Sequence, residues 1–175
     1  MPHSISSPPS PRLLPAEAPA PPPDVTVRDA SLGEVLALRA RILRAGRPVD
    51  QAVSRQDRLP ETRHLAARTA SGDVAGVVTY FVEDTGLAPG RRAVRFRGMA
   101  VDDALQGHGI GRALMRALVE RSRAERAEVL WANGRDGALG FYERIGFRVV
   151  GDGFLDDEMQ LPHHVVVAEV DDVTA

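Results

Sequence analysis

The chain has 175 residues, of which 43% are hydrophobic and 26% are charged, and its net charge at pH 7 is -2. This length fits one domain with a substantial core, and the near-neutral charge gives no general attraction to nucleic acid or anionic membranes. The sequence contains no cysteine and no lysine, because all 22 basic residues are arginines. Disulfides, cysteine nucleophiles, cysteine zinc sites, Walker A phosphate binding and Schiff-base chemistry are therefore excluded.

The N-terminal segment differs in composition from the rest of the chain. Residues 1–24 hold most of the thirteen prolines, mixed with serine and alanine, and this composition cannot bury a core. We expect a disordered tail at 1–24, one folded domain at 25–170 and a short C-terminal tail at 171–175. The absence of cysteine, of an apolar signal segment and of a membrane-length apolar run favours a cytoplasmic protein.

Hydrophobic periodicity divides the domain into short strands and helices. Val25–Arg28 alternates as a strand does, and a helix follows Ser31 and ends at Gly46-Arg47-Pro48. Residues 49–61 are polar and fit a short helix or loop. The other predicted elements are strands at Thr62–Arg68, Val74–Val82, Ala93–Val101, Val129–Ala132, Phe147–Val150 and Val165–Val170, and helices at Ile110–Ala124 and Ala138–Ile145. This order predicts a single α/β domain with a mixed sheet.

Three glycines at alternate positions, Gly107, Gly109 and Gly111, follow a predicted strand and open a predicted helix. Such a turn exposes backbone N–H groups at a helix N-terminus, where a phosphate binds favourably and meets no Cβ. The spacing does not fit the dinucleotide fingerprint, because Arg112 or Leu114 stands at its last glycine position. A glycine-rich connection without a ligand is the alternative interpretation.

The wider pattern resembles the GNAT superfamily of acetyl-CoA-dependent N-acetyltransferases. Gln106-Gly107-His108-Gly109-Ile110-Gly111 matches its Q/R-x-x-G-x-G/A signature and follows the strand Gly98-Met99-Ala100-Val101. Downstream, Leu130-Trp131-Ala132-Asn133 and Ala138–Phe147 resemble the later strand, helix and FYxxxGF segment of the superfamily. The resemblance covers residues 25–170. It implies the single-domain GNAT fold, a mixed central sheet with two splayed parallel strands, flanked by helices.

The resemblance also implies a binding mode for acetyl-CoA. The backbone of Met99–Val101 would pair with the pantetheine arm, and a backbone N–H near Val101 would polarise the thioester carbonyl. The turn from Gln106 to Arg112 would hold the pyrophosphate. The cofactor-binding residues implied in this way are Met99, Ala100, Val101, Gln106, Gly107, His108, Gly109, Ile110, Gly111, Arg112 and Asn133.

Tyr142 matches the tyrosine that the superfamily places near the thioester sulfur, which makes it the implied catalytic acid. The leaving thiolate of CoA gains from a proton donor, and a tyrosine with a pKa of about 10 still holds its proton at neutral pH. A core aromatic residue is the alternative interpretation. No covalent enzyme intermediate is required, which suits a chain without cysteine or a G-x-S-x-G elbow.

The general base is not identified by the sequence. Some members of the superfamily carry a glutamate several residues before the glycine turn, and counting back from Gln106 places Arg95 there. Arginine cannot act as a base, so this residue cannot play the role of that glutamate. The remaining candidates are Glu83, Asp84, His64, His163 or a water chain.

Two polar clusters have simple interpretations. His163 and His164 are typical of a polar turn before the last strand, although some GNAT branches have a similar proline–histidine segment beside the acceptor pocket. The densest basic patch consists of Arg91, Arg92, Arg95 and Arg97. A solvated or salt-bridged face is favoured for this patch over attraction of an acidic acceptor or of the CoA phosphates. No metal site is expected, because ligand spacing is lacking.

We therefore predict an N-acetyltransferase that moves acetyl from acetyl-CoA to a primary amine by direct attack. An acyl-CoA-binding sensor or regulatory module on the same scaffold is the alternative, because the strand glutamate is missing and a fold does not fix a function. The sequence leaves open the amine acceptor, another acyl chain such as propionyl or succinyl, and a homodimer. We expect no nucleic-acid partner and no membrane partner.

Overall fold

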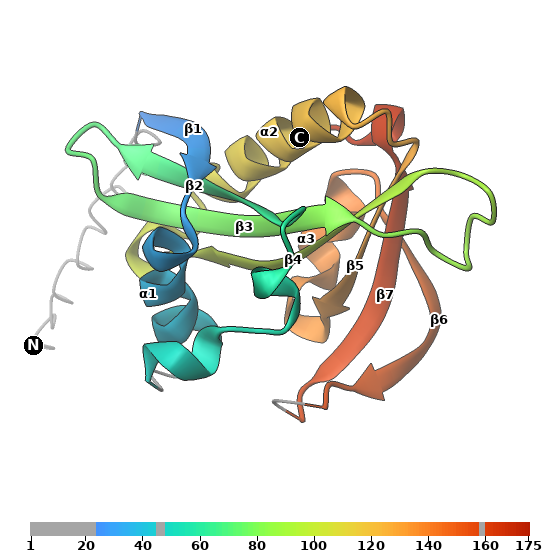
Figure 1. Cartoon of the computed structure of the whole chain (residues 1–175), viewed down its shortest axis with the longest axis horizontal. Helices are drawn as coiled ribbons and strands as arrows, with labels where there is room; N and C mark the ends of the chain where they lie inside the picture. Colours follow the sequence, from blue (N-terminus) through green and yellow to red (C-terminus); the bar gives the residue numbers. More distant parts are fainter. Residues whose placement is uncertain (1–23, 45–47, 158–159) are drawn as a thin grey trace, which may run out of the picture.

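The computed structural model describes residues 24–44, 48–157 and 160–175, and in these residues seven strands form one sheet (Figure 1). The strand order is β1-β2-β3-β4-β5-β7-β6. The strands are β1 (Val25–Ala30), β2 (Arg63–Thr69), β3 (Val74–Val82), β4 (Ala93–Val101), β5 (Val129–Arg135), β6 (Arg148–Leu155) and β7 (Pro162–Glu169), and the helices are α1 (Leu32–Leu43), α2 (Ile110–Ala124) and α3 (Leu139–Arg144). Neighbouring strands are antiparallel except β4 and β5, which are parallel. The predicted mixed α/β sheet is confirmed.

Local sequence explains where the first two helices begin. Ser31 caps α1 through a reciprocal capping box, in which its hydroxyl accepts from the Glu34 N–H and the Glu34 carboxylate accepts from the Ser31 N–H. The predicted end of this helix at Gly46-Arg47-Pro48 falls partly on 45–47, outside the described residues. Gly109 precedes α2 with a φ of 81°, a left-handed conformation that favours glycine.

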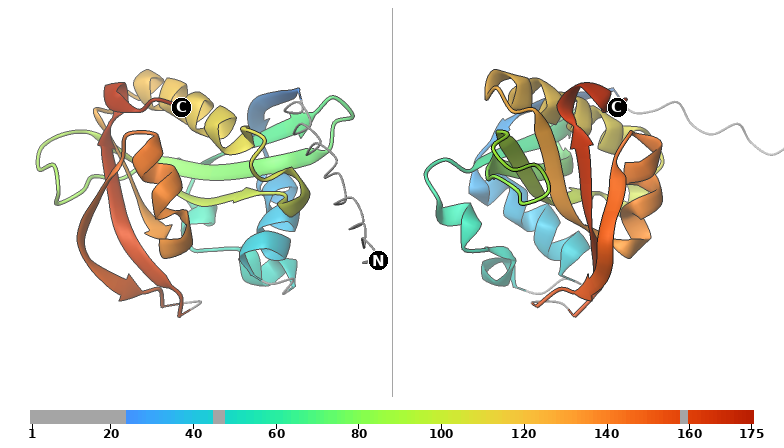
Figure 2. Two further views of the ribbon diagram at one scale, coloured as in Figure 1. Left: turned by 180° about the vertical axis from the view of Figure 1, so that it is seen from behind. Right: turned by 90° about the vertical axis from the view of Figure 1, so that its right-hand side faces the viewer.

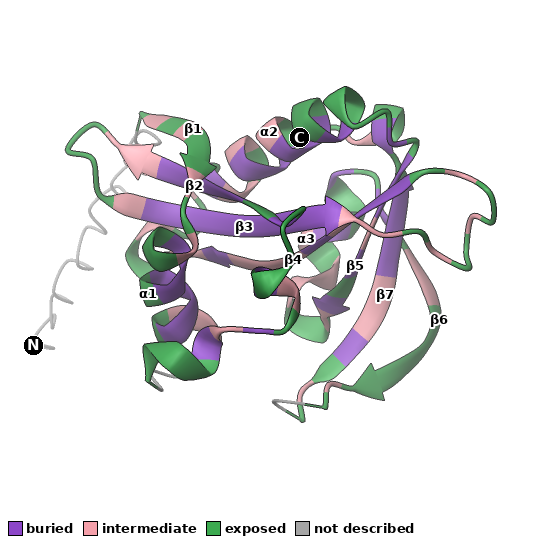
Figure 3. Cartoon of the chain, in the orientation of Figure 1, coloured by how far each residue is buried: buried purple, intermediate pink, exposed green. Residues whose placement is uncertain are grey.

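The helices cover opposite faces of the sheet (Figures 1 and 2). Ala66 and Val77 pack with α1, whereas the next residues along these strands, Leu65 and Val78, pack with α2 and α3. This alternation follows from the two-residue repeat of a strand. Figure 3 shows the buried residues concentrated in the sheet between the helices.

The sheet opens at its centre. The parallel pairing of β4 and β5 is limited to Ala93–Arg95 and Val129–Trp131, after which the two strands separate. Beside this point β4 carries a bulge at Gly98, where φ is 57° and the register with β3 shifts. A bulge bends a strand and increases its twist, so β4 turns away from β5 while β5 stays paired with β7. The splayed parallel strands implied by the family resemblance are present.

The C-terminal elements differ most from the prediction. The last strand begins at Pro162 instead of Val165, so the interpretation of His163 and His164 as a polar turn is wrong. The reason is that both histidines pair with β5, which itself runs on to Arg135. The segment 171–175 lies against the core, where the Thr174 N–H donates to the Ile145 carbonyl at 3.0 Å. The predicted N-terminal tail lies outside the described residues except for residue 24, and within the described chain no helix is long and apolar enough to span a membrane.

Candidate active site

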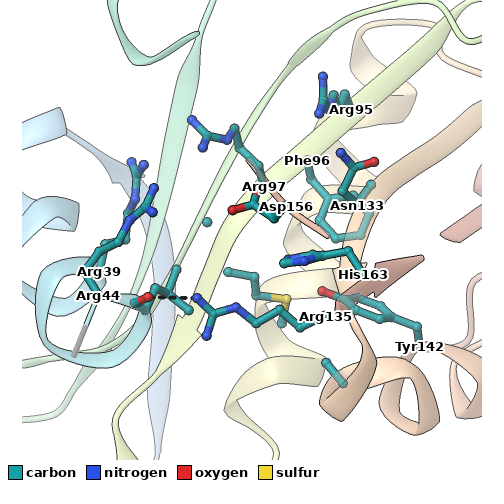
Figure 4. Close-up of a pocket in the computed structure, with 15 residues that line it drawn as sticks. Arg39, Arg44, Arg95, Phe96, Arg97, Asn133, Arg135, Tyr142, Asp156 and His163 are labelled. Carbon is teal, nitrogen blue, oxygen red and sulfur yellow. Dashed lines mark hydrogen bonds between the residues drawn. The ribbon is translucent and has the colours of Figure 1, made fainter. Parts of the chain in front are cut away.

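A cavity of about 170 Å³ lies where β4 and β5 separate (Figure 4). Residues from both sides of the gap line it, together with α1, α3 and the β6–β7 hairpin. The described lining residues are Arg39, Leu43, Arg44, Arg95, Phe96, Arg97, Gly98, Met99, Ala132, Asn133, Arg135, Ala138, Tyr142, Asp156 and His163. The predicted residues Met99, Asn133 and Tyr142 are therefore brought together at one cavity.

The strand register places the polar lining on the α1 side of the sheet. Side chains of residues paired across neighbouring strands point to the same face. Arg95 is paired with Trp131, and Arg135, on the same face of β5 as Trp131, is paired with His163. Tyr142 comes from α3 on the other face, and its hydroxyl points into the cavity (Figure 4). The cavity thus connects the two faces of the sheet through the gap between β4 and β5.

Tyr142 is held in an apolar setting that keeps its hydroxyl protonated. Its side chain packs near the rings of Phe96, Phe141 and Phe147, with centroid distances of 5.8, 5.4 and 5.7 Å, and the residue is 7% exposed. A Cβ at Gly134 would lie 3.1 Å from the tyrosine ring, a contact so close that the ring would have to shift slightly. Burial raises the pKa of Tyr142 to about 12. Its hydroxyl has no hydrogen-bond partner among the described residues, which leaves the proton available to a ligand.

His163 faces the same cavity with one nitrogen fixed. The residue is 8% exposed, stacks on Phe154 at 6.0 Å between ring centroids, and places Nδ1 2.8 Å from the Leu161 carbonyl oxygen. A carbonyl only accepts hydrogen bonds, so this contact requires Nδ1 to donate. In the neutral ring Nε2 then carries the lone pair, which is the form a general base needs.

The other three base candidates lie outside the cavity lining. Glu83 pairs with Arg95 at 3.0 Å, and Asp84 follows it in the loop after β3. His64 is buried and places Nδ1 2.8 Å from the Thr79 hydroxyl, and burial lowers its pKa. Of the four side chains that the sequence left open, His163 is the one that reaches the site.

The glycine turn forms an open surface at the start of α2. Gly107 and Gly109 have φ angles of 79° and 81°, and a Cβ at either position would meet no atom within 4 Å. The N-cap residue Gly109 provides no side-chain hydrogen bond, so it leaves the N–H groups of the first turn open to another acceptor. Met99 lines the cavity while its Cε would lie 3.4 Å from a Cβ at Gly111, so the turn adjoins the cavity.

The other predicted cofactor-binding residues have different surroundings in the structure. The Ala100 side chain is buried against α1, and the residue is paired with Val77 of β3. The side chain of Gln106 donates to Asp103 at 2.9 Å, which braces the turn instead of extending from it. His108 closes the turn through a contact of 2.9 Å between Nδ1 and the Gln106 carbonyl. Arg112 donates to the Thr174 carbonyl at 3.2 Å, so its guanidinium rests on the C-terminal segment.

Sequence reasoning missed the contribution of α1 to the cavity. Arg39 is 2% exposed and donates to both oxygens of Asp57 at 2.9 and 3.0 Å and to the Ala52 carbonyl at 3.0 Å. Burial alone would raise the pKa of Asp57, but hydrogen bonds from Arg39 and Ser54 lower it overall. Neither residue belongs to a recognisable motif, so no signal in the sequence identified this ion pair.

The predicted salt-bridged character of the basic patch is confirmed for three of its four arginines. Arg91 pairs with Glu128 and Glu169, and Arg92 pairs with Glu125. Arg95 pairs with Glu83 and stacks over the Trp131 ring at 4.5 Å. The glutamate expected on this strand in some GNAT proteins is thus replaced by an arginine held by two neighbours.

Comparison with known proteins places this geometry in a family. The sequence pattern of the Acetyltransferase (GNAT) family matches residues 34–147. The chain belongs to this family. The uncharacterized N-acetyltransferase YitI of Bacillus subtilis is 23% identical over 141 residues, which cover 81% of this chain and 93% of that protein. The L-methionine sulfoximine/L-methionine sulfone acetyltransferase of Pseudomonas aeruginosa is 33% identical over 90 residues, which cover 50% of this chain and 51% of that relative.

Solved structures agree on the fold of this GNAT protein. FeeM, an N-acyl amino acid synthase from uncultured soil microbes, superposes with a TM-score of 0.71 at 12% identity, covering 85% of this chain and 92% of that one. The predicted fold and enzyme class, a GNAT N-acetyltransferase, are confirmed. Family membership implies an acyl-CoA donor and an amine acceptor.

Proposed function

We propose that this GNAT protein transfers an acetyl group from acetyl-CoA to a primary amine by direct attack. The observation that carries the proposal is the placement of His163 and Tyr142 at one cavity, reached from opposite faces of the sheet. The Pseudomonas aeruginosa relative is named for L-methionine sulfoximine and L-methionine sulfone, which both carry a primary amine, and this supports an amine acceptor.

The open glycine turn supports binding of the CoA pyrophosphate at the start of α2, because uncapped N–H groups and the helix dipole favour an anion there. The β4 edge beyond Arg95 has no partner strand on the β5 side among the described residues, so its backbone can pair with the pantetheine arm. A backbone N–H near Val101 would then polarise the thioester carbonyl. Asn133 lies on the facing strand and borders the cavity.

The proposed reaction uses His163 as the base and Tyr142 as the acid. Nε2 of His163 accepts a proton from the amine, directly or through a water, while Nδ1 keeps its hydrogen bond to Leu161. The amine nitrogen bonds to the acetyl carbon and forms a tetrahedral intermediate. The carbon–sulfur bond then breaks, and the Tyr142 hydroxyl gives its proton to the leaving sulfur. Return of the proton from His163 to Tyr142 through solvent restores both residues.

A donor and acceptor screen tests this function. The full chain is incubated with acetyl-CoA, propionyl-CoA or succinyl-CoA and a panel of amines, while released thiol and N-acyl product are measured separately. We expect thiol release that depends on the amine, with acetyl-CoA giving the highest kcat/KM. Donor binding without amine-dependent thiol release would contradict the proposal and would favour an acyl-CoA-binding module.

A further inference from the structure

We propose that the amine acceptor carries an anionic group, a carboxylate or a phosphate, within a few bonds of its amine, and that Arg135 binds this group. The inference rests on the proposed function, because it names the class of acceptor for that reaction. The observations that carry it are the position, burial and partners of one arginine at the end of β5.

Arg135 is a half-buried cation that forms no ion pair with a carboxylate among the described residues. Its Nη2 donates to the Leu43 carbonyl at 2.8 Å, which fixes the guanidinium at the cavity wall (Figure 4). Across residues 24–44, 48–157 and 160–175, no carboxylate lies within ion-pair distance of this group. A guanidinium has five N–H donors, so Arg135 keeps donors for a ligand. A partly buried charge without a partner is costly, and a bound anion removes that cost.

The charges around Arg135 favour an anion as well. Five arginines and one carboxylate, that of Asp156, stand among the described lining residues. Asp57 and Glu83 offset the charges of Arg39 and Arg95. Burial lowers the pKa of Arg135, repulsion from Arg44 lowers it further, and Asp156 opposes both effects. Arginines thus outnumber carboxylates among the described lining residues, which favours an anionic acceptor over a polycationic one.

The register places the anion beside the reacting amine. Arg135 on β5 is paired directly with His163 on β7, so the two side chains leave the sheet on the same face. Residues paired in this way have Cβ atoms about 4.5–5.5 Å apart. We therefore place the amine at Nε2 of His163 and the anion at Arg135 a few bonds apart on one face of the site, as in an α-amino acid or an amino sugar phosphate. The pyrophosphate of CoA is assigned to the start of α2 on the other face, so it does not compete for Arg135.

Matched pairs of acceptors test the inference. The common L-amino acids are compared with their amides, and glucosamine 6-phosphate with glucosamine, as acetyl acceptors for wild type, Arg135→Gln and Arg123→Gln. Arg123 is an exposed α2 residue that pairs with Asp171 and does not line the cavity, and it serves as the control. We expect wild type to prefer the anionic member of the accepted pair at least about 10-fold in kcat/KM. Arg135→Gln should lower this preference about 10- to 100-fold, mainly through KM, whereas Arg123→Gln should keep it.

The remaining outcomes separate this inference from the proposed function. Equal or better turnover of amides, glucosamine or a polyamine would overturn the anionic acceptor and leave acetyl transfer standing. A preference for succinyl-CoA that is lost in Arg135→Gln would show that Arg135 binds an anion of the acyl donor and not of the acceptor. That result would also overturn the inference. No turnover with any amine, while acetyl-CoA still binds, would contradict acetyl transfer and this inference with it. Unchanged acetyl-CoA affinity and melting temperature show that Arg135→Gln is folded.

Discussion

Replacing Tyr142 with phenylalanine isolates the proton that the proposed reaction needs. The hydroxyl has no hydrogen-bond partner among the described residues, and the ring contacts with Phe96 and Phe147 are kept in the variant. The variant should therefore be at least as stable as the wild type at pH 7, because no hydrogen bond is lost and a buried hydroxyl is removed. A positioned acid contributes about 10²–10⁴-fold to a rate, which corresponds to roughly 3–5 kcal/mol of transition-state stabilisation.

Steady-state kinetics with a competent amine measure this loss. We expect kcat and kcat/KM for the amine to fall together, while the Kd for acetyl-CoA stays near that of wild type. The defect should shrink with an acyl donor whose leaving thiol has a lower pKa, because that thiolate needs less protonation. A rate within about twofold of wild type would refute the acid role of Tyr142 and reduce it to a packing residue.

Tyr142→Phe should also change how the free energy of unfolding depends on pH above pH 10. Burial raises the pKa of Tyr142 to about 12, above the ordinary value of about 10 that applies to the unfolded chain. The unfolded state loses this proton first, so the contribution is intact below pH 10 and falls as the pH rises toward 12. The wild type should lose about 2 kcal/mol over this range through Tyr142 alone. Denaturant unfolding should show that the free energy of unfolding of Tyr142→Phe falls less between pH 10 and pH 12 than that of the wild type. An equal fall in the two proteins would contradict the assigned burial of the hydroxyl.

Three further substitutions test other parts of the site. Gly111→Glu should raise the Kd for acetyl-CoA at least about 10-fold, because it places a carboxylate where the pyrophosphate is proposed to bind. Gly33→Glu, at the same second position of α1, is the control and should leave this Kd unchanged. Equal affinities of the two variants by calorimetry would contradict the pyrophosphate assignment. His163→Gln should lower kcat/KM for the amine about 10²–10⁴-fold at neutral pH. Its residual rate should rise with the fraction of deprotonated amine. A rate near that of wild type would assign the base to water. Asp57→Asn should cost about 3–5 kcal/mol in chemical denaturation, because it leaves Arg39 buried without its counter-ion. Because the pKa of Asp57 is lowered in the folded state, this stability is present above about pH 4 and is lost as the pH falls through that lowered pKa. The free energy of unfolding of the variant should therefore depend less on pH below about pH 4 than that of the wild type.

Local patterns were sufficient to predict most of the fold. The strands Val74–Val82 and Ala93–Val101 and the helix Ile110–Ala124 were predicted with their observed bounds, because alternation, amphipathic spacing and glycine turns are encoded within each segment. The C-terminal hairpin was harder. Its two strands extend to Leu155 and back to Pro162 through exposed or polar residues, so pairing between strands, and not local hydrophobicity, sets their ends.

The site was predicted where a motif marks it and missed where distant segments meet. The glycine turn and Tyr142 carry family patterns that are readable in sequence. Arg39 and Arg135 have no such pattern, and they share a cavity because β4 and β5 splay and α1 covers the opening. His163 stood among several candidate bases, and the pairing of β7 with β5 is what brings it to the cavity. Long-range register of this kind is not encoded in the spacing of residues along the chain.

The most direct test of the proposed function is a mass balance of the acetyl group. The wild-type chain is mixed with isotope-labelled acetyl-CoA and an accepted amine, the reaction is quenched at short times, and label is measured in CoA ester, amine and protein. Direct attack predicts one N-acetylated amine for each free CoA and no label on the protein at any time. Label on the protein that passes on to the amine would contradict direct attack, and acetyl-CoA that binds yet stays intact would contradict acetyl transfer itself.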